Sequence, residues 1–232
     1  MKRTAATFAL VLGLSAGVTG AISAGGRTPQ PDWYPAPVEY TEDGREKVDL
    51  ELVLAVDVSS SIDETEARRQ REGHVAALAD PEVISAIQSG GYGRIAILYL
   101  EWADADFQRV VAPWTVIGTE EDAQAFAASL ATSPFISGRR TAIGAAIDNS
   151  VSLIEGNAYA GQRLVVDLSG DGPQNAGPSL SAARRRADAA EVTAIRTAAA
   201  SAVATGVVYH HSRPKPARPS TTPCASAAGS EI

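Results

Sequence analysis

The sequence predicts a doubly wound α/β fold with a mostly parallel sheet, and three observations point to it. Apolar runs long enough for buried strands alternate with segments whose apolar residues repeat at helical spacing. These helical segments are long enough to serve as the crossovers that parallel strands require. Hydroxyl and carboxylate side chains follow directly after two of the apolar runs. In such a sheet the binding crevice lies at the carboxyl ends of the strands.

The elements follow one another in the order expected for this fold. They are a strand (residues 48–56), a helix with a short continuation (63–78 and 80–87), two strands (94–102 and 107–117), two helices (123–130 and 141–154), a strand (162–168) and a helix (180–190). The second run, at residues 94–102, reads as a buried strand. Pro113 places the third strand at an edge of the sheet, because proline cannot donate a hydrogen bond to a neighbouring strand.

Turn and capping residues set the boundaries of the helices. Asp80 and Pro81 break the first helical pattern, because proline disrupts the interior of a helix. Acidic residues at positions 120–122 open the next helix, where they complement the positive end of the helix dipole. The helix that begins at Thr141 carries an apolar stripe made of Ile143, Ala146, Ile147, Val151 and Ile154.

Length and composition indicate one exported domain. A chain of 232 residues can bury one sizeable core. Lys2 and Arg3 precede an apolar, small-residue run, so we predict a signal peptide at residues 1–24, followed by a Pro/Gly-rich linker at 25–47. We therefore expect a periplasmic or secreted protein without a stable membrane span after cleavage. The single cysteine, Cys224, cannot form an intramolecular disulfide, so the fold must rest on its core.

Charge and histidine spacing argue against other classes of partner and site. Residues 25–178 carry 11 Lys/Arg against 24 Asp/Glu, whereas residues 179–232 carry 7 against 3. An acidic body argues against nucleic acid as a partner, because phosphate binding needs a basic face. The histidines His74, His210 and His211 have no zinc-site spacing, and we expect His74 to be a surface or boundary residue of a helix.

The segment Asp-Val-Ser-Ser-Ser at residues 57–61 follows the first predicted strand directly. Its carboxylate and alternating hydroxyls are hard oxygen ligands, which suit Mg²⁺ or Mn²⁺ better than softer metals. Asp57, Ser59 and Ser61 can converge only if the chain turns immediately after the strand. The alternative interpretation makes Ser61 the N-cap of the following helix, with Glu64 completing a capping box.

Two further segments carry oxygen donors near predicted strand and helix ends. Thr141 stands at a helix start, and Asp171 follows the fourth strand in a Ser-Gly-Asp-Gly sequence. Each has a structural alternative, since Thr141 alone reads as an N-cap and Asp171-Gly172 alone as a turn. The second and third predicted strands carry Trp102 and Trp114, read as core or edge packing, and Glu101, read as a solvated strand-end charge.

This combination of Asp-x-Ser-x-Ser, a distant Thr and a distant Asp resembles the metal-ion-dependent adhesion site of von Willebrand factor A domains, over roughly residues 48–178. The wider sequence also resembles an uncharacterised bacterial branch of secreted, von Willebrand A-like proteins, classed as a domain of unknown function. The segments that carry this second resemblance are Val48-Asp49-Leu50-Glu51-Leu52, Glu101-Trp102, Val111-Ala112-Pro113-Trp114-Thr115 and Asp167-Leu168-Ser169-Gly170-Asp171-Gly172-Pro173. The first resemblance implies a Rossmann-like α/β sheet.

The resemblance also implies a ligand set and a mode of binding. Ser59, Ser61 and Thr141 would contact Mg²⁺ or Mn²⁺ directly, while Asp57 and Asp171 would supply charge directly or through water. One coordination position would stay open for a carboxylate presented by a protein or another ligand, as suits the incomplete protein cages that Mg²⁺ prefers.

Catalysis is the weaker interpretation of these residues. An aspartyl phosphatase would need a second acid where Ser59 stands, and Ser169 lacks both the glycine pattern and a histidine partner of a nucleophile elbow. The glycines at residues 90–93 precede a strand and open no helix, which excludes a dinucleotide-binding loop. Two alternatives stay open: a Mg²⁺-dependent hydrolase or phosphatase, and an exported structural domain with vestigial ligand residues.

The α/β pattern weakens after the last predicted helix. We assign the von Willebrand A-like domain to residues 48–190 and a low-complexity, disordered tail to residues 191–232. Residues 203–209 are the only strand-like run left, whereas the resembled family completes its sheet with a further strand and helix. We therefore expect an incomplete sheet and a departure from the family near residues 187–192. A frameshifted coding sequence would explain it, and reading the other two frames tests this.

Overall fold

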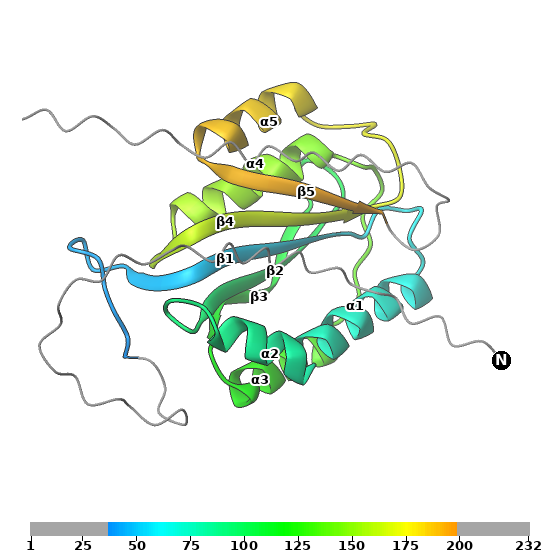
Figure 1. The fold of residues 1–232 in the computed structure, drawn as a ribbon. Helices are drawn as coiled ribbons and strands as arrows, with labels where there is room; N and C mark the ends of the chain where they lie inside the picture. Colours follow the sequence, from blue (N-terminus) through cyan, green and yellow to red (C-terminus); the bar gives the residue numbers. More distant parts are fainter. Residues whose placement is uncertain (1–36, 199–232) are drawn as a thin grey trace, which may run out of the picture.

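The structure, a computed structural model, describes residues 37–198. A five-stranded sheet has the order β3-β2-β1-β4-β5, and every neighbouring pair is parallel except β2 and β3 (Figure 1). The strands are β1 (Glu46–Asp57), β2 (Ile95–Trp102), β3 (Gln108–Ile117), β4 (Tyr159–Gly170) and β5 (Val192–Ala198). The helices are α1 (Glu64–Leu78), α2 (Pro81–Gln88), α3 (Glu120–Thr132), α4 (Ile143–Glu155) and α5 (Leu180–Ala189). The predicted doubly wound, mostly parallel fold is confirmed.

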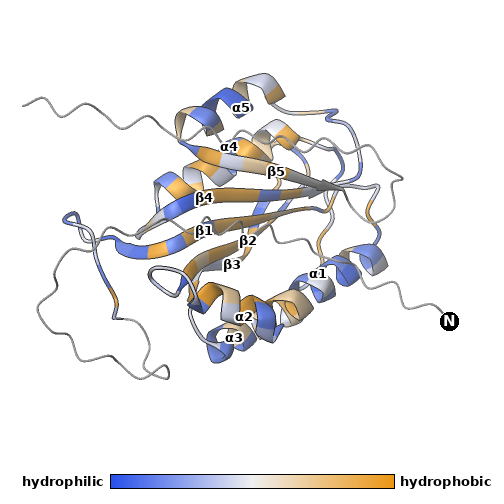
Figure 2. Ribbon diagram, viewed as in Figure 1, coloured by the Kyte–Doolittle hydropathy of each residue, from blue (hydrophilic) through white to orange (hydrophobic). Residues whose placement is uncertain are grey.

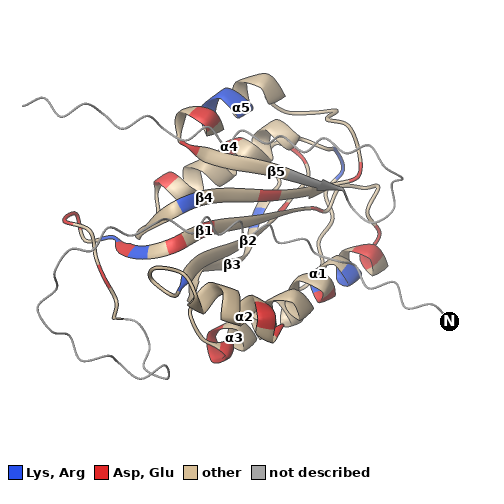
Figure 3. Cartoon of the chain, viewed as in Figure 1, with Lys and Arg blue, Asp and Glu red and all other residues tan. Residues whose placement is uncertain are grey.

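Helices cover both faces of the sheet, with α1, α2 and α3 on one side and α4 and α5 on the other (Figure 1). The central strand β1 supplies both cores, because successive side chains of a strand point to opposite faces. Leu52 and Leu54 pack with the first helix layer, whereas Val53 and Ala55 pack with the second. Figure 2 shows the resulting apolar strands between helices whose outer surfaces are hydrophilic. Charged residues accordingly gather on the helices and at the start of β1 (Figure 3).

The order of the strands places a topological switch point between β1 and β4. From β1 the chain moves outward through β2 to β3, and then returns to add β4 and β5 on the other side. Val56 is in register with Ser169, so β1 and β4 end side by side. Crevices at such switch points are where open α/β sheets bind their ligands.

The antiparallel strand β3 lies at the edge of the sheet, as the proline at position 113 predicts. The register between β2 and β3 shifts between the pairs Ile97–Thr115 and Tyr99–Ala112. Pro113 falls inside this irregularity, where a missing N–H group removes no regular ladder hydrogen bond.

The structure corrects the expected C-terminal boundary of the domain. Strand β5 continues the sheet beyond residue 190, paired in parallel with β4 from Leu164–Val192 to Gly170–Ala198. The expectation of a low-complexity tail is therefore wrong for residues 192–198. Val192 is buried in the α4–α5 core, so the neighbouring layer stabilises a strand that its sequence signals weakly. Residues 199–232, which include 203–209 and Cys224, lie outside the described residues, as does the predicted signal peptide.

Two side chains expected near solvent are instead buried on the α1 face of the sheet. Glu101 is only 2% exposed and forms ion pairs with Arg71 and Arg109. His74 is 5% exposed and packs edge-on against Tyr99, with ring centroids 5.4 Å apart. Both expectations are wrong because α1 and α3 close over this part of the sheet. Within residues 37–198, no helix is long and apolar enough to cross a membrane.

Candidate metal site

The chain turns sharply at the end of β1, as convergence of the Asp-x-Ser-x-Ser oxygens requires. The Ser59 amide donates to Asp57 Oδ1 over 2.8 Å, and the Ile62 amide donates to the Ser59 carbonyl over 2.9 Å. An aspartate that accepts from the amide two residues on is a local turn motif that competes with regular structure. This turn places the hydroxyls of residues 59 and 61 3.1 Å apart.

The structure brings together the oxygen-bearing side chains that the sequence analysis singled out. Ser61 Oγ donates to Asp171 Oδ1 over 2.9 Å, which joins the end of β1 to the end of β4. Thr141 Oγ1 lies 3.5 Å from Ser59 Oγ, which adds the segment before α4. A Cβ atom at Gly170 would lie 3.2 Å from Asp57 Oδ2, so the ends of β1 and β4 meet closely there.

The helix-cap alternatives for Ser61 and Thr141 are wrong. Helix α1 begins after Asp63, whose side chain accepts from the Glu66 amide over 2.8 Å. Helix α4 has Ala142 at its N-cap position and no side-chain cap from it. The hydroxyls of Ser61 and Thr141 therefore contribute to the oxygen cluster instead of capping a helix.

Burial divides the cluster into an inner and an outer part. Asp57, Ser59 and Thr141 are 0%, 1% and 5% exposed, whereas Ser61 is exposed and Asp171 is partly exposed. The inner side chains are shielded by the core, whereas the outer ones are accessible to solvent. In the described part of the chain, no group of three or more His, Cys, Asp or Glu side chains is arranged to hold a metal. The donor set here is two carboxylates and three hydroxyls, which suits a hard divalent cation.

The sequence analysis missed two side chains that hold the Thr141 segment in place. Asn175 Oδ1 accepts from the Thr141 amide over 2.8 Å, and the Asn175 amide donates back to the Thr141 carbonyl over 3.0 Å. Gln174 Oε1 accepts from the Gly144 amide over 2.9 Å and so satisfies the first turn of α4. Both residues follow Asp171 in the loop after β4, and that proximity was the only signal in the sequence.

Asp104 is a third missed residue, and it fixes the approach to Thr141 from the other side. Its carboxylate accepts from the Arg139 and Arg140 amides over 2.8 and 3.2 Å, and from Arg140 Nε over 2.7 Å. The Arg140 side chain, followed by the Arg139 amide, lowers the pKa of Asp104 to about 2. Its place just after β2, at the carboxyl edge of the sheet, is the signal that could have identified it.

Replacing Gly138 by alanine is expected to disturb this segment. A Cβ atom there would lie 2.2 Å from the Ala103 Cβ, while the Gly138 amide donates to the Val58 carbonyl over 2.9 Å. The overpacking should cost about 2 kcal/mol of unfolding free energy, measured by urea denaturation. Gly73→Ala is the control, because nothing lies within 4 Å of its Cβ and α1 should gain up to about 1 kcal/mol. Wild-type stability of Gly138→Ala would contradict the prediction.

A family model described as a protein of unknown function, DUF1194, matches residues 47–208. The chain belongs to this DUF1194 family. The match runs past residues 187–192, where we expected the chain to leave its family, so that expectation is wrong. No curated protein sequence matches the chain.

Among solved structures, proximal thread matrix protein 1 from the mussel byssus is similar to this DUF1194 protein, with a TM-score of 0.51 and 22% identity over 66% of this chain and 38% of that one. Another structure of the mussel protein, with a zinc-occupied MIDAS motif, has a TM-score of 0.47 and 20% identity over 66% of this chain and 38% of that one. A von Willebrand factor type A structure from Catenulispora acidiphila has a TM-score of 0.46 and 14% identity over 66% of this chain and 33% of that one. The chain thus spans less than half the length of these structures. The von Willebrand A resemblance is confirmed for the fold.

Proposed function

We propose that this DUF1194 protein is a binding module that depends on a divalent cation. Asp57, Ser59, Ser61, Thr141 and Asp171 would hold Mg²⁺ or Mn²⁺, with the hydroxyls and carboxylates acting as hard oxygen ligands. When bound, the cation supplies a positive charge at the carboxyl edge of the sheet that can accept a ligand oxygen. A protein or other ligand presenting a carboxylate would fill the remaining coordination position.

The observation that carries the proposal is the convergence of oxygens from three distant segments at the switch point. Ser59, Ser61 and Asp171 form one hydrogen-bonded chain, and Thr141 reaches the same serine. Helix capping does not explain these hydroxyls, since Asp63 caps α1 and α4 begins at Ala142. Hydroxyls that cap no helix and converge with two carboxylates form the arrangement expected of a cation site.

The protein is further proposed to work outside the cytoplasm, as a periplasmic or secreted protein. The basic start and small-residue apolar run of residues 1–24 support a removable signal peptide, followed by the proposed linker at residues 25–47, whose last two residues already belong to β1. The acidic body of the domain supports a cation-mediated contact with an acidic partner, because direct contact between like charges is unfavourable.

Isothermal titration calorimetry with Mg²⁺ and Mn²⁺ tests the cation site. Asp57→Ala and Asp171→Ala are each expected to weaken Mg²⁺ binding by about 10-fold or more, because each removes a negative oxygen ligand from the cluster. Asp188→Ala makes the same charge change on the exposed face of α5 and should leave the affinity unchanged.

The possible outcomes separate the alternatives. Wild-type protein that binds neither cation, or that binds it equally well without Asp57 and Asp171, would leave an exported structural domain as the better interpretation. Steady hydrolysis of a simple phosphoester by the Mg²⁺-loaded protein, lost in Asp57→Ala, would instead favour a hydrolase. Zn²⁺ belongs in the same titration as a softer cation for comparison.

A further inference from the structure

Glu101 lies at the centre of a buried charge cluster that the proposed metal site does not use. Its carboxylate pairs with Arg71 of α1 and, over 2.5 Å, with Arg109 of β3. The carboxylate is 2% exposed, and the two arginine side chains are 11% and 26% exposed. Buried ion pairs stabilise a fold weakly or not at all compared with apolar packing, so this one calls for another explanation.

Both arginines also donate to backbone carbonyls at the end of α3 and at the start of the α3–α4 loop (residues 133–142). Arg71 Nη1 donates to the Ser133 carbonyl over 2.5 Å and to the Leu130 carbonyl over 3.3 Å. Arg109 Nη2 donates to the Pro134 carbonyl over 2.8 Å. These carbonyls lie at and just after the end of α3, where regular helical hydrogen bonding stops.

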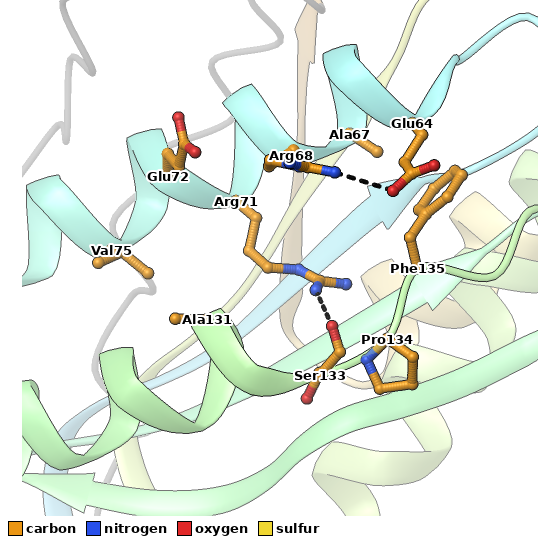
Figure 4. Close-up of a pocket in the computed structure, with 10 residues that line it drawn as sticks. All are labelled: Glu64, Ala67, Arg68, Arg71, Glu72, Val75, Ala131, Ser133, Pro134 and Phe135. Atoms are coloured by element: carbon orange, nitrogen blue, oxygen red, sulfur yellow. Dashed lines mark hydrogen bonds and ion pairs between the residues drawn. The ribbon is translucent and has the colours of Figure 1, made fainter.

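Figure 4 shows how Arg71 reaches this loop. Its side chain leaves α1 and points at Ser133, beside a cleft of about 390 Å³ that Pro134 and Phe135 also line. Arg68, one turn earlier, turns outward to Glu64 at the surface. Of these two arginines, Arg71 is therefore the one that hydrogen-bonds the loop, and its pairing with Glu101 fixes its direction.

The α3–α4 loop also carries groups that build the candidate metal site. Its amide at Gly138 donates to the Val58 carbonyl over 2.9 Å, and its carbonyl at Arg139 accepts from Ser60 Oγ over 2.8 Å. Thr141 is the second-last residue of the same loop. The arginines fix the start of the loop, and Asp104 and the end of β1 fix its later part.

We infer that Glu101, through Arg71 and Arg109, positions the α3–α4 loop and thereby the Thr141 side of the metal site. Glu101 is a positioning residue, because it acts on the site through the arginines and the loop backbone. Two arginines held at fixed angles on one carboxylate define the loop start more rigidly than two independent surface contacts. For its effect on the metal, the inference rests on the proposed function. Its effect on the loop is independent of that function.

Hydrogen exchange of the loop, measured by mass spectrometry without metal, tests the inference. Arg109→Met removes the Pro134 contact and is expected to reduce protection of the amides at residues 138–142 by about 10-fold. Arg94→Met is the control, because Arg94 forms a partly buried ion pair, with Glu46 over 3.4 Å, before β2 and away from the loop. Its loop protection should stay at the wild-type level.

Mg²⁺ affinity of the same variants is the second readout. Arg109→Met should weaken Mg²⁺ binding by about 10-fold, as expected for residues that support metal ligands, and Arg94→Met should not.

Unchanged loop exchange in Arg109→Met, or an equal loss of loop protection in both variants, would overturn the inference. Absence of both Mg²⁺ and Mn²⁺ binding in the wild type would overturn the proposed function, while loop exchange still decides the positioning role. If Arg109→Met does not fold, Arg109→Lys replaces it, because lysine keeps the charge but lacks the planar fork.

Discussion

Replacing Glu101 by glutamine is expected to lower the free energy of unfolding by about 3 kcal/mol, measured by urea denaturation. The change keeps the size of the side chain but leaves Arg71 and Arg109 as shielded cations without a counter-ion. Water reaches Arg109 partly, since its side chain is 26% exposed, so the value lies at the low end for a broken buried pair.

Glu46→Gln provides the comparison for that result. It removes the partner of Arg94 at the opposite end of β2, where the side chain is 20% exposed and the charges are 3.4 Å apart. A looser and wetter ion pair should cost less than about 1 kcal/mol. Equal losses in the two variants would show that the Glu101 cluster contributes no more than the single Arg94–Glu46 pair.

Acidification is expected to destabilise the protein through His74. Burial lowers the pKa of His74 from 6.5 to about 4, because the charged imidazolium loses its hydration. The unfolded chain therefore binds the proton more readily, and stability is lost as the pH falls from 6.5 towards 4. The loss should reach about 2 kcal/mol between pH 7 and pH 5, and about 3 kcal/mol in total.

The measurement is a series of urea denaturation curves from pH 7 to pH 5, repeated with His74→Leu. Tyr99 lies against the imidazole, with its hydroxyl 3.5 Å from His74 Nδ1, and leucine would fill this largely apolar space. The variant should lose most of the slope in this pH window. Asp104 does not interfere, because its folded pKa of about 2 moves its contribution to pH values below 4. A wild-type slope in His74→Leu would assign the pH dependence to other groups.

The sequence located the candidate site because its residues lie at the ends of elements that are themselves strongly signalled. The apolar runs before Asp57 and before Ser169 are rich in residues that favour strands. The carboxyl ends of both strands could therefore be located in the sequence. Parallel strands bring these ends to one edge, which made the meeting of Ser61 and Asp171 predictable. The N-cap alternative for Ser61 could not be decided, because Asp63 is an equally good cap two residues on.

Residues that support the site were not predictable, because their roles depend on backbone atoms far away in sequence. Asn175 binds the Thr141 backbone, and Asp104 binds amides 35 and 36 residues further on. Nothing in the side chain itself distinguishes such a residue from one that faces water. Strand β5 was not predicted for a related reason, since Val192 and its small neighbours form a strand only beside β4.

Local pattern by itself determined the layered α/β architecture, the edge position of β3 and the oxygen-rich strand ends. Apolar periodicity, proline and capping residues act within a few residues of each other, so a single chain displays them directly. Only the tertiary structure decided that Glu101 and His74 are buried and that β5 completes the described sheet. Burial of a polar group depends on which distant elements close over it, and here Arg71 of α1 and Arg109 of β3 meet Glu101.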